Sequence, residues 1–414
     1  MAAYGLIGEK LSHSFSQVIH EKLFDIPYSL IPLRPEELDG FLKRREFTGI
    51  NVTIPYKKSV IPYCDFLDSR AKATGAVNTI VNRDGRLYGY NTDFDGFSNT
   101  LQKNRIAAEG KVALVLGNGG VSQPVQAVLK EKGAKEVLVA SRRPLAGTIS
   151  YEEAIHRTEA ELIINTTPVG MYPDTGKSPI VLSDFPRLMA VIDLIYNPLR
   201  TELLLKAEEL HILAVNGLFM LTAQAKTAAE LFQGVKIPDQ KTDEIYRELR
   251  MQKGNLSLIG MPMSGKSTVG RIVADMLHKE FVDVDKVIEK KADMAIPEIF
   301  ERFKEAGFRE LEREAVKEVS QQNGLVISTG GGTPLLSENI RNLRQNGCIA
   351  FLDRPLSKLS VGKGRPLAKS KEEITELYSK RYSIYRSSCD FVVSNQADAQ
   401  TAAKKLFHLY EQHY

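Results

Sequence analysis

The chain has 414 residues, of which 43% are hydrophobic and 26% are charged, and its net charge is +4. This length exceeds what one hydrophobic core normally supports, so we expect two or three ordinary globular domains. The small net charge argues against a nucleic-acid partner, and no apolar run approaches the ~20 residues of a membrane span. The three scattered cysteines and the lack of a signal peptide or metal-binding spacing predict a cytoplasmic protein without disulfides. The oligomeric state does not follow from the sequence.

The N-terminal part contains several short polar segments that suit a small polyhydroxylated substrate. A hydroxyl-rich loop covers residues 12–16, Lys57 follows the segment Asn51–Pro55, and the segments GAVNT and NTD come next. Each segment alone is typical of turns. Together they offer many hydrogen-bonding groups, with Lys57 and Asp93 available for proton transfer. His13 is an alternative acid, although a histidine in a loop is more often structural.

Four apolar runs that alternate with helical patterns predict a largely parallel sheet. They are Val112–Leu116, Val137–Ala140, Leu162–Ile164 and Val191–Leu194. The first run leads into Gly117-Asn-Gly-Gly-Val-Ser122, an approximate dinucleotide-binding turn that is weak evidence alone. The second leads into Ser141, Arg142 and Arg143. An NAD site usually has an acidic residue there, so two arginines favour the 2′-phosphate of NADP over a merely solvated basic turn.

Over residues 1–250 these segments closely resemble shikimate dehydrogenase, as do NTTPVGM at Asn165–Met171 and the segment Asn216–Gln224. The resemblance implies that Lys57 and Asp93 form the catalytic pair and that NADP(H) is the cofactor. The residues it implies for shikimate are Ser14, Ser16, Asn51, Thr53, Asn78 and Gln224, with Tyr196 near the cofactor. The predicted NADP site comprises Gly117, Gly119, Gly120, Ser141, Arg142, Arg143, Thr166 and Gly217.

The two halves of the chain are separated by a polar helical stretch, Lys241–Arg250, followed by residues 251–255. We find no apolar face in this stretch and take it as an inter-domain junction; a second boundary is expected near 101–110. Five further apolar runs predict a second parallel sheet. They are Leu256–Ile259, Phe281–Val284, Leu325–Ile327, Ile349–Leu352 and Phe391–Val393.

The strongest motif is GMPMSGKS at Gly260–Ser267, between a predicted strand and the helical pattern Thr268–Leu277. Gly-x4-Gly-Lys-Ser in this context is a phosphate-binding loop, in which Lys266 reaches the outer phosphates and the Ser267 hydroxyl ligates Mg2+. The predicted nucleotide-binding residues are Gly260, Met263, Ser264, Gly265, Lys266, Ser267 and Thr268. Farther along, strand alternation places Asp283 and Asp285 on one face, toward the loop.

Three consecutive glycines at 330–332 allow a backbone to approach a ligand closely. With the segments GFRELE, GRPL and RYSIY, this part resembles shikimate kinase over residues 255–414. The resemblance implies ATP and Mg2+, with Lys266, Asp285 and Arg365 as catalytic residues and Arg365 in a lid. The implied metal ligands are Ser267 and, through water, Asp283. The residues implied for shikimate are Asp285, Arg309, Gly331, Gly332 and Arg381.

We therefore predict an α/β protein with three domains. They are a substrate domain (1–104, completed by 217–250), a Rossmann-like NADP domain (105–216) and a P-loop kinase α/β domain with a parallel sheet (251–414). The expected function is NADPH-dependent reduction of 3-dehydroshikimate followed by phosphorylation of shikimate. The alternatives are a metabolite-sensing regulator derived from these domains, and a first domain that uses quinate.

Overall fold

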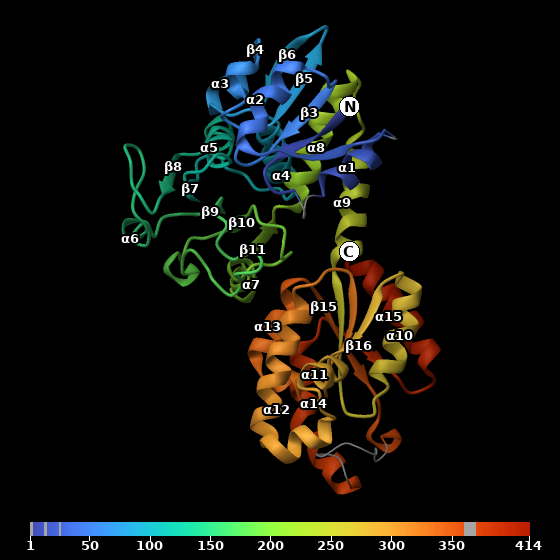
Figure 1. The fold of residues 1–414 in the computed structure, drawn as a ribbon. Coiled ribbons are helices and arrows are strands. Elements are labelled where there is room, and N and C mark those ends of the chain that lie inside the picture. The colour runs from blue at the N-terminus through green and yellow to red at the C-terminus, as the bar shows by residue number, and fades with distance from the viewer. Residues whose placement is uncertain (1–2, 12–14, 25, 360–369) are drawn as a thin grey trace. The chain divides into compact units, whose positions relative to one another are not determined.

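The computed structural model describes residues 3–11, 15–24, 26–359 and 370–414. These residues form two compact units. The first comprises Met1–Tyr196 and Thr201–Tyr246, and the second comprises Asn197–Arg200 and Arg247–Tyr414. In each unit, helices cover sheets (Figure 1). No helix in the described ranges is long and apolar enough to cross a membrane.

The first unit begins with a six-stranded sheet. Its strands are β1 (Tyr4–Gly8), β2 (Ser29–Pro32), β3 (Gly49–Val52), β4 (Phe66–Leu67), β5 (Thr79–Arg83) and β6 (Arg86–Tyr90). They lie in the order β2-β1-β3-β5-β6-β4, and β5 runs antiparallel to both β3 and β6. Asp84 and Gly85 join β5 to β6 with positive φ angles of 50° and 80°, as a two-residue hairpin turn requires. The two antiparallel pairs that β5 forms are the exception to otherwise parallel pairing in this sheet.

Helices cover both faces of this sheet. They are α1 (Ser16–Leu23), α2 (Pro35–Arg44), α3 (Ser69–Thr74), α4 (Asp93–Lys103) and α8 (Leu218–Gln233), with a 3-10 turn at Ile61–Tyr63. Alternation along β1 sends Ile7 into a core with Leu42 of α2, and Leu6 into a core with Phe232 of α8. Helix α8 also packs against α4 and α1. A side chain at Gly49 would overlap the Phe232 ring, so this helix lies close to the sheet.

The second sheet of the first unit is five-stranded and parallel. Its strands are β7 (Val112–Leu116), β8 (Glu136–Ala140), β9 (Leu162–Asn165), β10 (Ala190–Asp193) and β11 (Leu213–Asn216), in the order β11-β10-β9-β7-β8. Its other elements are α5 (Ser122–Glu131), α6 (Tyr151–Ala154), α7 (Glu202–Glu209) and a 3-10 turn at Leu182–Asp184. Val115 and Leu114 of β7 lie in separate cores on the two faces. The four predicted strands are confirmed to within one residue at each end.

The second unit has one parallel sheet. Its strands are β12 (Asn255–Ile259), β13 (Glu280–Asp283), β14 (Leu325–Ser328), β15 (Gly347–Asp353) and β16 (Phe391–Ser394), in the order β13-β14-β12-β15-β16. Its helices are α10 (Lys266–Leu277), α11 (Val284–Ala292), α12 (Ile296–Ser320), α13 (Ser337–Gln345), α14 (Lys371–Ser388) and α15 (Ala399–His413), with 3-10 turns at Thr333–Leu335 and Leu356–Lys358. Leu258 and Ile259 of the central strand lie in cores on opposite faces. The five predicted strands are confirmed to within two residues.

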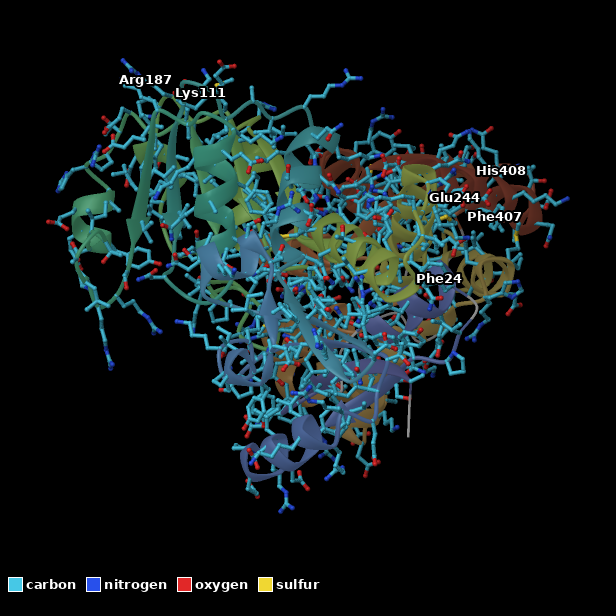
Figure 2. All side chains as sticks on the ribbon, turned by 90° about the horizontal axis from the view of Figure 1, so that it is seen from above. Phe24, Lys111, Arg187, Glu244, Phe407 and His408 are labelled. Carbon is cyan, nitrogen blue, oxygen red and sulfur yellow. The ribbon has the colours of Figure 1, made fainter. Side chains whose placement is uncertain are left out.

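Helix α9 (Asp239–Lys253) contains the predicted junction Lys241–Arg250. The expectation that this stretch has no apolar face is wrong, because Ile245 and Leu249 are 2% and 1% exposed. These two residues are one helical turn apart and form a narrow buried stripe. The charged residues that dominate the sequence lie on the other side, where Glu244 is exposed (Figure 2).

The C-terminal end of α9 is held by side chains of the second unit. The Lys279 Nζ donates hydrogen bonds to the carbonyl oxygens of Met251 (2.8 Å), Gln252 (3.0 Å) and Gly254 (2.9 Å). The Tyr410 hydroxyl donates to the carbonyls of Met251 (2.9 Å) and Gly254 (2.7 Å). The last carbonyls of a helix have no partner within the helix. Lys279 and Tyr410 supply those partners here.

Candidate active sites

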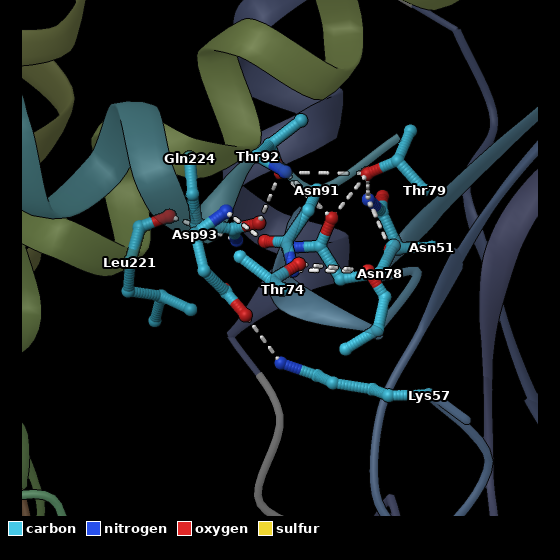
Figure 3. Close-up of polar contacts among 11 residues, drawn as sticks. Asn51, Lys57, Thr74, Asn78, Thr79, Asn91, Thr92, Asp93, Leu221 and Gln224 are labelled. Atoms are coloured by element: carbon cyan, nitrogen blue, oxygen red, sulfur yellow. Dashed lines mark hydrogen bonds and ion pairs between the residues drawn. The ribbon is translucent and has the colours of Figure 1, made fainter. Parts of the chain in front are cut away.

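Lys57 and Asp93 face each other in the first unit (Figure 3). Lys57 lies in the turns after β3, and Asp93 is the first residue of α4. The Lys57 Nζ lies 2.6 Å from Asp93 Oδ2, and the two side chains are 18% and 10% exposed. The N-terminus of a helix is a suitable place for a carboxylate, and here that carboxylate pairs with Lys57. The pair therefore holds a proton donor in a nearly enclosed position.

Asn91 fixes the backbone at Asp93. The Asn91 Oδ1 accepts a hydrogen bond from the Asp93 amide (3.1 Å), and its Nδ2 donates to Thr74 Oγ1 (2.9 Å) and to the Ala76 carbonyl (3.0 Å). The position of the carboxylate thus depends on the loop before β5 as well as on α4. Asn91 and Thr74 were not among the predicted site residues, although Asn91 begins the NTD segment that indicated this region.

A hydrogen-bond network of amides and hydroxyls lies beside the pair (Figure 3). Asn51 Nδ2 donates to Thr79 Oγ1 (3.0 Å), which in turn donates to Asn78 Oδ1 (3.1 Å). The Thr92 amide donates to Asn78 Oδ1 (2.8 Å), and the Thr92 hydroxyl donates to Gln224 Oε1 (3.1 Å). The structure therefore brings the predicted residues Asn51, Asn78 and Gln224 together. Thr79 and Thr92 were missed, and their places within GAVNT and NTD were the available signal.

The remaining predicted residues of this site lie on neighbouring segments. Thr53 follows β3, and its amide donates to a carbonyl of β1 (2.9 Å). Ser16 begins α1 and is buried. The Tyr196 ring packs against Phe15, with 5.5 Å between the ring centroids. Ser14 lies outside the described residues.

The turn after β7 has the form of an anion-binding cradle. Gly117 has a φ of 97°, and a side chain there would press against Thr167. Side chains at Gly119 and Gly120 would meet nothing within 4 Å, so their backbone faces open space. Helix α5 begins directly afterwards at Ser122, and the amide groups of a helix N-terminus attract phosphate. The residues present fit a dinucleotide.

The other predicted cofactor residues surround this turn. Arg142 and Arg143 are exposed in the turn after β8, where the Arg143 amide donates to Ser141 Oγ (3.3 Å). The Thr166 hydroxyl donates to the last carbonyl of β7 (2.7 Å). A side chain at Gly217 would overlap the carbonyl that follows β10, so only glycine allows this approach.

A buried aspartate missed by the sequence analysis connects these loops. Asp193 is fully buried at the end of β10, where it accepts hydrogen bonds from Thr201 Oγ1 (2.6 Å), Asn165 Nδ2 (3.0 Å) and the Ile195 amide (3.1 Å). Asn165 Oδ1 accepts in turn from the Thr167 hydroxyl (2.7 Å). Asp193 thereby holds the loop that lies against the dinucleotide turn. In the sequence, the signal for this role was that Asp193 directly follows the apolar residues of its strand.

Asp193→Asn should change how stability depends on pH. Burial raises the pKa of Asp193 to about 7, and hydrogen bonds from Thr201, Ile195 and Asn165 oppose that shift. The folded chain then keeps a proton that an unfolded aspartate loses near pH 4, so stability falls as pH rises from about 4 to 7. The measurement is the melting temperature of the unfolding transition that NADP+ stabilises, for the wild type and for Asp193→Asn. Between about pH 4 and 7 the wild-type value should fall relative to the value of the variant. Parallel curves for the two proteins would contradict the assignment.

In the second unit, the loop after β12 wraps around its own lysine. Gly260, Met263 and Gly265 have positive φ angles of 148°, 65° and 92°. The Lys266 Nζ donates to the carbonyl oxygens of Gly260 and Met261, both at 2.9 Å. This places the ammonium group inside the ring of backbone that a phosphate-binding loop forms around its ligand. Helix α10 begins at Lys266 and directs its N-terminal amides to the same place.

The hydroxyl groups of this loop also fit a nucleotide and a metal ion. The Ser264 Oγ is buried and has no hydrogen-bond partner among the described residues, so it is available to a ligand. The Ser267 Oγ donates to Asp283 Oδ2 (2.8 Å). A hydroxyl beside a carboxylate is a donor set that Mg2+ prefers. Thr268 lies exposed in the first turn of α10.

The structure corrects the predicted geometry of the two aspartates. Strand β13 ends at Asp283, and Asp285 lies in the first turn of α11. They do not alternate along one strand, because the Asp283 side chain caps the helix by accepting from the Asp285 amide (3.1 Å). Asp285 nevertheless lies beside the glycine segment, since a side chain at Gly330 would sit 3.2 Å from its Oδ1.

Two arginines approach the glycines after β14. The Arg309 Nη1 lies 2.7 Å from Glu312 Oε2, and a side chain at Gly332 would overlap the Arg309 guanidinium. The Arg381 Nη1 donates to the Gly331 carbonyl (3.1 Å). Both predicted arginines therefore meet the predicted glycine segment. Their guanidinium groups are suited to a carboxylate ligand.

Glu312 is a further residue whose role the sequence analysis missed. Its side chain is 1% exposed and pairs with Arg309, while its Oε1 accepts from the Thr333 hydroxyl (2.6 Å). The spacing of three residues between Arg309 and Glu312 on one helix was the available signal. Arg365 lies outside the described residues.

Two family models match the chain. One, described as the shikimate dehydrogenase substrate binding domain, matches residues 6–80. The other, described as shikimate kinase, matches residues 262–411. The two matches fall in the first and second compact units; the first includes Lys57, and the second includes Lys266 and Ser267 of the phosphate-binding loop.

Individual relatives match the first part of the chain. The shikimate dehydrogenase (NADP(+)) of Clostridium perfringens strain 13 is 36% identical over 268 residues, which cover 60% of this chain and 99% of the relative. The crystal structure of shikimate dehydrogenase 1 from Peptoclostridium difficile has 40% identity, a TM-score of 0.56, and coverage of 61% of this chain and 98% of that one. The Thermus thermophilus enzyme in complex with NADP(H) and shikimate has 33% identity, a TM-score of 0.55, and coverage of 60% and 99%. The chain belongs to the shikimate dehydrogenase family and carries a shikimate kinase domain in its second part.

Proposed function

We propose that this chain catalyses two consecutive reactions: reduction of 3-dehydroshikimate to shikimate with NADPH, and phosphorylation of the 3-hydroxyl of shikimate with ATP and Mg2+. One observation carries the proposal. The same chain holds a lysine–aspartate pair inside a polar cluster and a phosphate-binding loop beside two arginines. The product of the first site is the substrate of the second.

We assign the first reaction to a substrate domain of residues 1–104 and 217–250 and an NADP domain of residues 105–216, and the second to residues 251–414. The six-stranded sheet, the five-stranded sheet after it and the sheet of the second unit support this assignment. The packing of α8 against α4 and α1 supports joining 217–250 to the substrate domain.

In the first reaction NADPH supplies a hydride to the ketone carbon when it is bound. Negative charge then grows on the substrate oxygen, and Lys57 donates a proton to it. Asp93 orients the Lys57 ammonium group through their ion pair. The residues proposed to hold the ring are Ser14, Ser16, Asn51, Thr53, Asn78 and Gln224, with Tyr196 near the cofactor.

The NADP site is proposed around the turn after β7. The positive φ of Gly117 and the open backbone at Gly119 and Gly120 support binding of the pyrophosphate there. Arg142 and Arg143, with Ser141, would bind the 2′-phosphate through charge-assisted hydrogen bonds. Thr166 and Gly217 complete the proposed cofactor site.

In the second reaction the loop residues position the nucleotide and neutralise charge, because phosphoryl transfer needs little else from a protein. The residues proposed for ATP are Gly260, Met263, Ser264, Gly265, Lys266, Ser267 and Thr268. Ser267 and Asp283 would hold Mg2+, Asp285 would accept the proton of the 3-hydroxyl, and Arg365 would cover the transferring group. The shikimate carboxylate would pair with Arg309 and Arg381 beside Gly331 and Gly332.

We also propose that the protein acts in the cytoplasm on small-molecule substrates. Cys64, Cys348 and Cys389 are free thiols, as a reducing compartment favours.

A coupled assay tests the proposed function. The full chain is given 3-dehydroshikimate and NADPH, and ATP with Mg2+ is added once NADPH consumption has stopped. We expect loss of NADPH absorbance first and formation of one ADP per shikimate afterwards. In one parallel assay NADH replaces NADPH, and the reduction should be slower. In a second, the chain oxidises shikimate or quinate with NADP+, and quinate oxidation should be the slower of the two. Absence of both reactions would instead favour a regulator, and faster quinate oxidation would favour a quinate dehydrogenase.

A further inference from the structure

A second buried cluster lies behind the polar network of the first site. It consists of His20 on α1, Tyr28 just before β2 and Asn51 on β3, which are 3%, 2% and 5% exposed. The rings of His20 and Tyr28 are stacked, with 4.2 Å between centroids and 5° between planes. The Tyr28 hydroxyl donates a hydrogen bond to Asn51 Oδ1 at 2.7 Å. Neither Tyr28 nor His20 belongs to the site residues assigned above.

This bond decides which way the Asn51 amide points. With Oδ1 occupied by the Tyr28 hydroxyl, the Nδ2 end faces Thr79 Oγ1 (3.0 Å) and the Asn78 carbonyl (3.4 Å). A rotated amide would place its oxygen against that carbonyl and its NH2 against the hydroxyl, and would leave buried polar groups without suitable partners.

The consequence extends along the network. The Thr79 hydroxyl accepts from Asn51, so its own hydrogen is free to point to Asn78 Oδ1. Asn78 Oδ1 also receives the Thr92 amide, and the Thr92 hydroxyl donates to Gln224 Oε1. Tyr28 thus stands at the donor end of a series of hydrogen bonds that runs through Asn51 and Thr79 to Asn78 Oδ1. Thr92 donates to the same oxygen and links it to Gln224, so the connected network reaches three of the residues proposed to bind shikimate. Hydrogen bonds in such a series strengthen one another.

His20 holds the Tyr28 ring without adding charge. Burial lowers the pKa of His20 to about 3, while a hydrogen bond with Asn51 opposes that shift. The imidazole is therefore neutral at physiological pH. A flat neutral ring on one face of Tyr28 restricts the rotation that would move the hydroxyl away from Asn51.

We propose that Tyr28 is a positioning residue of the dehydrogenase site: its hydroxyl, held by the stacked His20 ring, sets the orientation of Asn51 and of the hydrogen-bond network that receives the hydroxyl groups of the substrate. This proposal rests on the proposed function. It assigns no contact between Tyr28 and the reacting atoms.

The test compares two conservative variants of the full chain. Tyr28→Phe removes one hydroxyl and keeps the stacked ring. Tyr56→Phe is the matched control, because Tyr56 is also 2% exposed and its hydroxyl donates to a backbone carbonyl, that of Leu33, at 2.6 Å. Tyr28→Phe should raise the KM for 3-dehydroshikimate about 10-fold, which corresponds to about 1.4 kcal/mol. Its kcat should change less than about threefold, and its KM for NADPH should stay unchanged, as should all constants of Tyr56→Phe.

A double-mutant cycle shows whether the effect passes through Asn51. In an Asn51→Ala background, Tyr28→Phe should have no further effect on the KM. Additive effects, equal effects of the two tyrosine variants, or a selective loss of kcat would overturn the proposal. Should Tyr28→Phe fail to fold, Thr79→Val breaks the next bond of the series and must raise the same KM. An inactive wild type would refute the proposed function instead, so the two failures can be told apart.

Discussion

Lys57→Ala should slow the reduction of 3-dehydroshikimate by about 10²- to 10⁴-fold in kcat, the usual contribution of a positioned acid or base. The Lys57 Nζ is 2.6 Å from Asp93 in a nearly enclosed position, and an alanine leaves the substrate oxygen without a proton donor. Shikimate phosphorylation should be unchanged, because Lys57 belongs to the first compact unit and the phosphate-binding loop to the second. Stopped-flow measurement of NADPH consumption and a separate ADP assay provide both numbers.

Lys58→Ala is the control for this experiment, since Lys58 is the next residue and is exposed. It removes the same charge from the same turn and should leave both reactions intact. Equal loss of reduction and phosphorylation in Lys57→Ala would indicate misfolding or a shared site. Equal effects of the two lysine variants would show that net charge, and not a proton donor, is what the reduction needs.

Lys266→Ala should lower the kcat for shikimate phosphorylation by about 10³-fold or more, because a phosphate-binding lysine stabilises charge that develops only during transfer. Shikimate should still bind, since the arginines proposed for its carboxylate lie near the glycines after β14. Calorimetric titration with shikimate and an ADP assay separate binding from transfer. Reduction of 3-dehydroshikimate should stay at the wild-type rate.

Lys290→Ala is the matched control in the second unit, because Lys290 is exposed on α11. Loss of shikimate binding in Lys266→Ala would mean that the lysine supports the fold of the site. In that case, removing its hydrogen bonds to Gly260 and Met261 would be the cause. If Lys266→Ala still phosphorylated shikimate at the wild-type rate, the phosphate-binding loop would have no role in the transfer.

The parallel strands could be predicted because both of their faces are buried. Such strands read as short continuous apolar runs, and Val112–Leu116 has the same bounds in sequence and structure. The errors arose where a local hydrogen bond changes the backbone. Asp285 was placed on a strand by alternation, but the Asp283 cap turns the chain into a helix one residue earlier. In α9, Ile245 and Leu249 were overlooked among charged neighbours, because two buried residues suffice for a narrow stripe.

Those residues of the dehydrogenase site that stand in short contiguous motifs could be predicted from the sequence. Lys57, Asn78 and Asp93 stand in short segments whose composition already indicates their chemistry. Partners defined only by the fold could not be found in this way. Thr92 and Gln224 are 132 positions apart, and Tyr28 and Asn51 are 23 apart with no motif in common. Such pairs depend on which strands and helices become neighbours.

The packing of α8 has a consequence for the order in which the chain can fold during synthesis. The first sheet is complete once β6 has left the ribosome, but the core on the face that carries Leu6 also needs Phe232 and Ala228 of α8. This apolar face therefore stays partly exposed while the whole second sheet is synthesised, and exposed apolar surface promotes association with other chains. The second unit is nearly continuous in sequence and faces no comparable delay. The slow step of biogenesis should thus belong to the reductase, and the ribosome reaches the kinase only after α8 has been translated.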